Sequence, residues 1–511
     1  MVPSCLVGVA GDEQTVYFLL IAYCATAAVC GLRSWPVLAA GAVAVATPTA
    51  IASLESSSAS TLMAVALAFW AVTVLGNFFP GFRSAEQLPP ETEWLPYVTL
   101  AAVSSLIAGG VAIQLADHST QGAAAPEAYG WMIGFSVLHL AGALATRMAA
   151  VKPRRLEEFL WALGSSGLTI GLAMAFSDSA LTVAWATKAI AMAVLLRNSD
   201  RVELKLATGL LVALCAAHVL LVDAPPDDLT LSAWDYTSGA LVSTVVSVLA
   251  VIAAASAWAI FSKDEIRVLA GFTALASFVY LLGILFNGLA LVDTLCATAI
   301  VTVLVTRGSG GVPGLAASGA VLAIAIVQTL GYQAPLDVAL TTGVVDLEAA
   351  VAALLAIAFT ATCAALLYEQ REVRLASAGL ACLTLLYLGS VLIVATFQPS
   401  ASELNALGTE TSFGIRQQGQ AWLSGFWALA ALGGVVYGVR RRNAAVRYAA
   451  LSLLSVAVVK ILLFDLTSLD ATYRTISFVA VGAMLLLAAF AYQNIRAQVK
   501  SGEDVPPAGA N

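Results

Sequence analysis

Long unbroken runs of apolar residues fill this chain and constrain its fold more than any other feature. Many of the runs reach the roughly 20 residues that an α-helix needs to cross the hydrocarbon core of a bilayer. Lipid offers no hydrogen bonds to the backbone, so a spanning segment is either a helix or part of a closed barrel. The apolar residues do not alternate with polar ones, which favours helices. The sequence therefore predicts an all-α, polytopic transmembrane helix bundle.

Composition excludes several classes of protein. The chain has 511 residues, of which 60% are hydrophobic and only 11% are charged, whereas soluble domains carry about 25% charged residues. The formal net charge of −7 argues against binding to nucleic acid. The seven cysteines form no CxxC pair, so we expect no metal site of that type. No P-loop, GxSxG or HExxH motif is present, and we expect no cofactor.

We place about seventeen spans, arranged as tandem helical hairpins with one final helix. They lie near 14–32, 36–52, 60–79, 94–114, 130–149, 156–176, 180–196, 203–222, 236–262, 265–286, 289–306, 314–331, 345–368, 373–397, 420–439, 444–464 and 472–493. The longest outer loop is expected at about 398–419. Residues 1–511 thus form a single multi-span membrane domain, and residues 501–511 are expected to be a short disordered tail.

Basic residues occur in every second connection between these spans, and acidic residues occur in the connections between. The basic connections hold Arg33, Arg83, Arg147 to Arg155, Arg197 to Lys205, Lys263, Arg307, Arg371 and Arg440 to Arg447. Cytoplasmic loops collect Lys and Arg, so the pattern predicts an outside N-terminus and an inside C-terminus in the bacterial inner membrane.

Two of the predicted hairpins align with each other without gaps. Residues 185–223 match residues 427–465, with Trp185 over Trp427 and His218 over Lys460. Asp223 then falls over Asp465. The two hairpins lie eight spans apart, so they share an orientation across the membrane, as a parallel internal repeat requires.

The segment 427–493 has the most distinctive pattern in the chain. Its landmarks are Trp427, Arg447, the run Lys460-Ile-Leu-Leu-Phe-Asp465, Leu469, Tyr473-Arg474, Ser477-Phe478, Gly482 and Tyr492-Gln493. This pattern resembles the C-terminal signature of a bacterial family of multi-pass membrane proteins, the domain-of-unknown-function family numbered 2339. The resemblance covers close to 70 residues and implies a cell-envelope protein with no assigned activity.

Ionisable residues inside the predicted spans are the first candidates for a functional site. Lys460 lies within an apolar helix, and two roles are open. It contacts a substrate or a transported proton, or it extends its ammonium group to the membrane interface. Asp465 is five residues away and, on an α-helix, well off the same face, so a neighbouring helix or Arg474 is the expected partner of Asp465. Lys188 lies at the depth of His218 on the next helix. Together they either form a polar pair lining a cavity or make interhelical hydrogen bonds.

A second candidate is the group of outer aspartates Asp223, Asp227 and Asp228, which flanks Pro225-Pro226. Such a cluster is either a solvated acidic loop or a site that holds a metal and a lipid-linked donor. We expect membrane lipids as partners, with a lipid-linked or small-molecule ligand as a further possibility. The favoured function is envelope transport, lipid handling or scaffolding. The alternative is a membrane-embedded glycosyl or phospho transferase that uses these aspartates. Such enzymes usually need a larger outer loop or domain than the one expected at about 398–419, which favours a protein that is not an enzyme.

Overall fold

The computed structural model describes nine continuous stretches of the chain. These are residues 58–76, 95–117, 126–148, 154–197, 202–226, 241–306, 312–341, 345–398 and 401–461, together with single residues near 17–25 and 475–486. All regular secondary structure in these stretches is helical. The expected spans 14–32, 36–52 and 472–493 and the tail 501–511 lie almost wholly outside the described residues.

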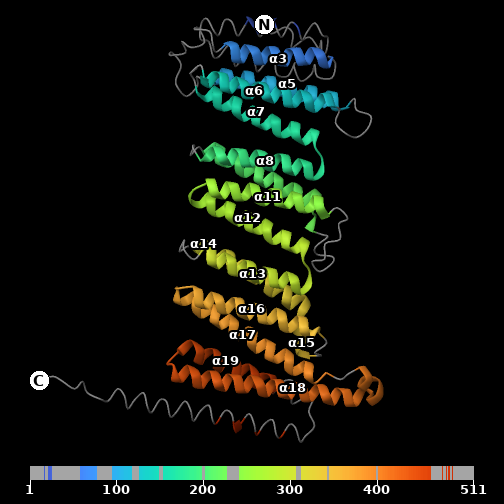
Figure 1. Ribbon diagram of the computed structural model, residues 1–511, viewed down its shortest axis with the longest axis vertical. Coiled ribbons are helices and arrows are strands. Elements are labelled where there is room, and N and C mark those ends of the chain that lie inside the picture. The colour runs from blue at the N-terminus through green and yellow to red at the C-terminus, as the bar shows by residue number, and fades with distance from the viewer. Residues whose placement is uncertain are drawn as a thin grey trace, which may run out of the picture. The chain divides into compact units, whose positions relative to one another are not determined.

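Figure 1 shows the helices of the described stretches in chain order. Their bounds are α3 (Ala59–Gly76), α5 (Leu95–Asp117), α6 (Pro126–Met148), α7 (Arg154–Ala175), α8 (Asp178–Leu196), α9 (Val202–His218), η2 (Val219–Asp223), α11 (Leu241–Phe261), α12 (Asp264–Leu285), α13 (Gly288–Thr306), α14 (Val312–Gln328), η4 (Thr329–Gln333), α15 (Leu336–Thr341), α16 (Leu347–Leu367), α17 (Arg371–Thr396), α18 (Ala401–Arg440) and α19 (Ala444–Lys460).

The long helices correspond to the expected spans from 60–79 to 444–464. In the described part of the chain, eleven helices are long and apolar enough to cross a membrane. The helices α3 and α5 contain shorter apolar stretches, Ala59–Ala68 and Ser104–Ala116. The helical membrane class of the fold is therefore confirmed, while the count of about seventeen spans stays a prediction.

The helix α18 differs from the expectation at its start. The segment 398–419 was expected to be an outer loop, but α18 begins at Ala401 and continues for 40 residues. Between residues 401 and 440 the sequence has no proline, whereas Pro399 stands just before the helix. A polar sequence without proline keeps its backbone hydrogen bonds inside the helix and needs no apolar surroundings. Hydropathy located the apolar part of this helix and missed its polar start.

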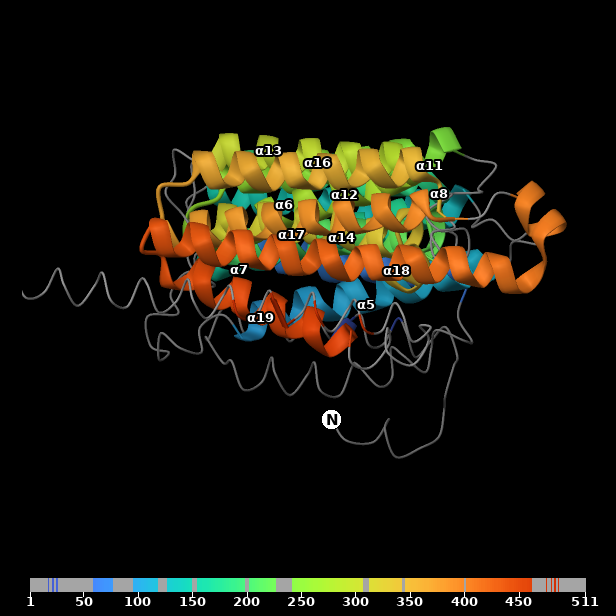
Figure 2. The same cartoon turned by 90° about the horizontal axis from the view of Figure 1, so that it is seen from below.

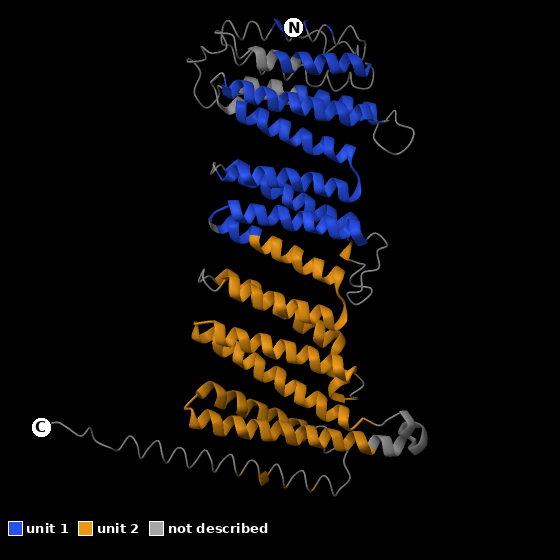
Figure 3. Ribbon diagram, viewed as in Figure 1, with its two compact units in different colours: residues 1–224, 240–270 blue, residues 225–239, 271–511 orange. Residues whose placement is uncertain are grey.

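The described chain divides into two compact units (Figure 3). Unit 1 contains residues 1–224 and 240–270, and unit 2 contains residues 225–239 and 271–511. Within unit 1 the strongest packing joins α6 with α7, α8 with α9 and α11, and α3 with α5. Within unit 2 it joins α13 with α14 and α16, α16 with α17, and α18 with α17 and α19. Figure 2 shows α16, α17 and α18 of unit 2 side by side.

Close packing of α7 on α6 in unit 1 depends on small residues. A Cβ atom added at Gly164 would lie 2.9 Å from the Ser136 backbone oxygen, and one at Gly171 would lie 2.8 Å from the Ile133 side chain. Both glycines face α6, because these neighbours belong to that helix. Transmembrane helices lack a hydrophobic driving force between them, so small residues that allow backbones to approach are a main source of their packing energy.

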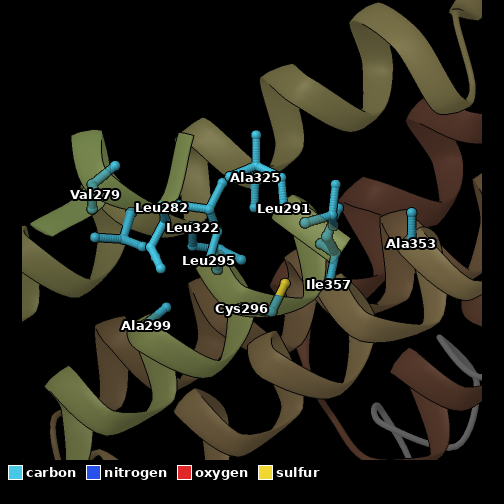
Figure 4. Close-up of a cluster of buried hydrophobic side chains, with 12 residues drawn as sticks. Val279, Leu282, Leu291, Leu295, Cys296, Ala299, Leu322, Ala325, Ala353 and Ile357 are labelled. Carbon is cyan, nitrogen blue, oxygen red and sulfur yellow. The ribbon is translucent and has the colours of Figure 1, made fainter. Parts of the chain in front are cut away.

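One core cluster of unit 2 lies between α12, α13, α14 and α16 and consists of leucine, valine, alanine, one isoleucine and one cysteine. Leu291, Leu295 and Cys296 of α13 contact Leu322 and Ala325 of α14, with Ile357 of α16 completing the cluster (Figure 4). The labelled side chains of Leu291, near the start of α13, and Ala325, near the end of α14, lie next to each other. This packing fixes the register between α13 and α14, on which the positions of the polar residues beyond Ala325 depend.

Candidate functional site

Two helices, α9 and α14, end in the same unusual way, in a turn of π-helix. The helix α9 continues into η2, and α14 continues into η4. The N–H of Ala224 donates to Val219 O at 2.7 Å, and the N–H of Ala334 donates to Thr329 O at 2.8 Å. These i→i+5 bonds bring side chains five residues apart to the same side of the helix, and such turns are frequent at functional sites.

In unit 1, the π-turn brings together a hydroxyl, an imidazole and a carboxylate, which we call the His218 node. Thr182 of α8 donates its hydroxyl proton to Asp223 Oδ2 at 2.8 Å, and His218 Nδ1 lies 2.9 Å from Thr182 Oγ1. The same imidazole nitrogen is 3.4 Å from Asp223 Oδ2. Because Thr182 gives its only proton to the carboxylate, His218 must carry a hydrogen on Nδ1 to complete these contacts.

Burial and further bonds hold the His218 node together. Thr182 is 0% exposed and the Asp223 side chain is 4% exposed. Thr244 of α11 donates to the backbone oxygen of Asp223 at 3.0 Å. The ring of Trp185 stands edge-on to the His218 ring, with centroids 5.9 Å apart. The node therefore ties α8, η2 and α11 together within unit 1.

The outer aspartates receive no support as a metal cluster. Asp223 is engaged with Thr182 and His218, whereas Asp227 and Asp228 lie outside the described residues. Among the residues that the structure describes, no group of three or more His, Cys, Asp or Glu side chains has the arrangement of a metal site.

Lys188 does not join His218. Its ammonium group donates instead to Ser165 O and Thr169 Oγ1, both on α7. Trp185, one turn earlier on α8, donates its indole N–H to Thr169 O at 3.1 Å. Lys188 thus makes interhelical hydrogen bonds, which was the second of its two expected roles. The two residues were expected at the same depth, but His218 contacts Thr182, which precedes Lys188 by six residues on α8.

In unit 2, Lys460 forms a second polar node, which we call the Lys460 node. Its Nζ donates to Ser424 Oγ at 2.8 Å and to Gln420 O at 3.2 Å, both on α18. Trp427, further along α18, donates to Ser390 Oγ of α17 at 2.8 Å. The backbone beyond Lys460 enters a π-type turn at Ile461. Asp465 and Arg474 lie outside the described residues.

A mostly apolar pocket lies beside these elements in unit 2. Its volume is about 340 Å³. The pocket lies between α14 with η4, α15, α16, α17 and α18, and its lining is Ile326, Thr329, Leu330, Leu336, Leu340, Leu354, Ile357, Leu380, Leu383, Thr384, Leu386, Tyr387, Ser390 and Trp427. Leu336 and Leu383 are exposed, so the pocket reaches the surface of the unit. Tyr387 donates its hydroxyl to Ala334 O at 2.6 Å and closes one polar edge.

Sequence reasoning did not find the pocket or the π-turns. Leucines that line a pocket and leucines that face lipid are alike in sequence, so hydropathy gives no signal for the pocket. The π-turns do leave a sequence signal, because Ala-Pro follows each of them at 224–225 and 334–335. Proline cannot continue the helix and restricts the residue before it, which marks the point where the helix ends.

A family profile described as "Predicted membrane protein (DUF2339)" matches residues 14–495. The chain belongs to this family. The match extends far beyond the 70 residues that carried the resemblance and includes the segments of the His218 node, the Lys460 node and the pocket. Membership agrees with the apolar helices in assigning a membrane location. No curated protein matches the chain.

Proposed function

We propose that this protein handles lipid in the bacterial cell envelope by holding a hydrocarbon chain in the pocket of unit 2. The observation that carries this proposal is the leucine-rich pocket of about 340 Å³, which lies at the lower end of the volumes usual for ligand sites. Leu336 and Leu383 connect the pocket with the exposed surface of the unit. On a transmembrane helix that surface faces hydrocarbon, so a lipid chain is the occupant whose chemistry matches both the pocket and its entrance.

The polar residues favour lipid handling over transport of a polar solute. His218, Lys188 and Lys460 each make hydrogen bonds to neighbouring helices. Side chains that bond one another in this way hold helices together and need no solvated pathway. Nor does the His218 node resemble the nucleophile of a transferase. Its hydroxyl, on Thr182, is 0% exposed, so no substrate reaches it.

A tryptophan at the pocket entrance is expected to exclude the chain. Leu383→Trp places a large ring at a lining residue of α17 that is 64% exposed. Each buried methylene contributes about 0.8 kcal/mol, so displacing two of them weakens binding about tenfold. Native mass spectrometry of the detergent-solubilised protein with methyl oleate measures this loss of affinity.

Leu385→Trp is the matched control for the Leu383 variant. Leu385 belongs to the same helix and is 49% exposed, but it does not line the pocket. We expect wild-type affinity for methyl oleate in this variant. Equal affinities in the two tryptophan variants would show that the chain binds elsewhere and would remove the proposal.

We also propose that the N-terminus lies outside and the C-terminus inside the inner membrane, as the loop charges favour. In an otherwise cysteine-free protein, a cysteine at Ser402 or Thr409 should react with a membrane-impermeant thiol reagent added to intact cells. A cysteine at Asn443, in the turn between α18 and α19, should react only after permeabilisation. The opposite labelling pattern would reverse the orientation.

The contacts also support the proposed internal repeat of residues 185–223 and 427–465. Thr182 and Ser424 are 242 positions apart, as are His218 and Lys460 (182 to 424, 218 to 460). In both hairpins the hydroxyl on the entering helix bonds the polar residue at the end of the returning helix. In both, a tryptophan three residues after the hydroxyl donates to the helix that precedes the hairpin.

A further inference from the structure

Arg416 of unit 2 is a basic residue at the start of the apolar part of α18. That part begins at Gly414, so Arg416 lies in its first turn. The side chain is partly buried, and its Nε atom is buried without a hydrogen-bond partner among the described residues. No carboxylate in those residues forms an ion pair with Arg416. A guanidinium group that has lost part of its hydration in this way calls for an acceptor of opposite charge.

The charge of Arg416 is also unusual for the side of the membrane on which we place it. Arg416 belongs to the segment 398–419, which the loop charges assign to the outer side. The basic connections, such as those at Arg371 and at Arg440 to Arg447, are assigned to the inner side. A basic residue that opposes this distribution needs another role, and contact with an anionic head group at the membrane boundary is one.

Arg416 lies on the face of α18 that is turned toward the pocket. Residues four and seven positions apart share a face of an α-helix, so Arg416, Gln420 and Trp427 form one stripe. Trp427 lines the pocket. Gln420 donates from Nε2 to the backbone oxygen of Leu340 at 2.6 Å, and Leu340 is itself a lining residue. Arg416 therefore stands one turn, about 6 Å along the axis, beyond the contact of α18 with the pocket wall.

We propose that Arg416 binds the anionic head of an acyl lipid whose chain occupies the pocket of unit 2. This inference rests on the proposed function and names the ligand class of the same site. Arg416 and Trp427 are about 16 Å apart along the helix axis, a distance that a long acyl chain spans. The guanidinium fork matches the two oxygens of a carboxylate or a phosphate, and such charge-assisted bonds are stronger than neutral ones.

The test compares two ligands that share the oleoyl chain and differ in charge. Oleate ends in a carboxylate, whereas methyl oleate ends in a neutral ester. We expect the wild-type protein in detergent at neutral pH to bind oleate about tenfold more tightly by native mass spectrometry, because the carboxylate gains charge-assisted hydrogen bonds. In Arg416→Gln this preference should disappear, while methyl oleate should bind as before and so report an intact pocket.

A second variant at the same position keeps the charge and covers the case in which Arg416→Gln does not fold. Arg416→Lys has a cation without the planar fork, so it should retain only part of the preference for oleate. An unchanged preference in Arg416→Lys would contradict a bidentate contact. Arg440→Gln removes a positive charge from an exposed residue at the other end of α18. It is the matched control and should keep the wild-type preference.

Two further measurements separate a lipid from a small anion. Acetate has the carboxylate without the chain and should not displace oleate at the same concentration. Leu383→Trp, which narrows the pocket, should weaken the binding of oleate as well as that of methyl oleate. Displacement by acetate, or wild-type binding of oleate to Leu383→Trp, would assign the anion to a site that is independent of the pocket.

The outcomes also separate this inference from the proposed function. Equal wild-type affinities for oleate and methyl oleate, or a preference that persists in Arg416→Gln, would overturn the head-group site and leave the chain pocket standing. Failure of both ligands to bind the wild-type protein would overturn both.

Discussion

Replacement of Asp223 by alanine is expected to lower the free energy of unfolding of unit 1 by about 3–5 kcal/mol, the usual effect of removing one member of a buried, hydrogen-bonded pair. Asp223 accepts from Thr182 at 2.8 Å and lies 3.4 Å from His218. Without it, the Thr182 hydroxyl loses its acceptor in a buried site, and His218 loses the carboxylate beside its ring. Equilibrium unfolding in mixed micelles, monitored by far-ultraviolet circular dichroism, measures the change.

Two further variants define the origin of this loss. Asp223→Asn keeps an acceptor oxygen and should cost less than Asp223→Ala. Glu203→Ala removes an exposed carboxylate from the first turn of α9 and should change stability by no more than about 0.5 kcal/mol. If Asp223→Ala were as mild as Glu203→Ala, the His218 node would not stabilise the fold.

Replacement of Lys460 by methionine is the second large expected effect, and it tests the internal repeat directly. The register places Asp465 where Asp223 lies in the first hairpin, and the backbone enters a π-type turn at Ile461. We therefore expect Lys460 to pair with Asp465 across this turn. Lys460→Met then leaves a carboxylate without its cation and costs about 3–5 kcal/mol. Asp465→Asn should have a comparable effect, and the double variant should recover much of the loss.

Lys188→Met is the matched control for Lys460→Met. Lys188 likewise donates to a carbonyl and a hydroxyl of a neighbouring helix, but the residue five positions after it is Ala193 and not an aspartate. Thr169 retains its own bond to Ser165 O when Lys188 is removed, so the variant should be neutral or slightly more stable because an ammonium group leaves an apolar region. Additive effects of Lys460→Met and Asp465→Asn would contradict the pairing.

Sequence reasoning predicted the helices well because apolar length is the signal that the bilayer imposes. The span expected at 289–306 is α13 at Gly288–Thr306, and the span expected at 345–368 is α16 at Leu347–Leu367. The polar start of α18 was missed because it carries no hydropathy signal. Backbone hydrogen bonding, which does not depend on apolar side chains, determines the helix there.

The arrangement of the polar residues was harder to predict, for two physical reasons. The spacing of five between His218 and Asp223 places them on different faces of an α-helix, but the π-turn brings them into contact. The same argument had separated Lys460 from Asp465. Lys188 and His218 were expected at one depth, but His218 contacts Thr182, six residues before Lys188 on α8, because hydropathy gives only an approximate register between neighbouring helices. The pocket depends on how leucines from several helices pack, and a single sequence does not show which leucines contact one another.

The pattern of helix contacts has a consequence for biogenesis. Within each unit, the strongest contacts join elements that are close along the chain, such as α6 with α7, α8 with α11, and α16 with α17. Few distant segments have to wait for one another before they pack. As the chain leaves the ribosome, each hairpin can be inserted and can assemble on the hairpin before it, in the order of synthesis. An error in one hairpin then disturbs its immediate neighbours first, and quality control can recognise the defect before the last helices are made.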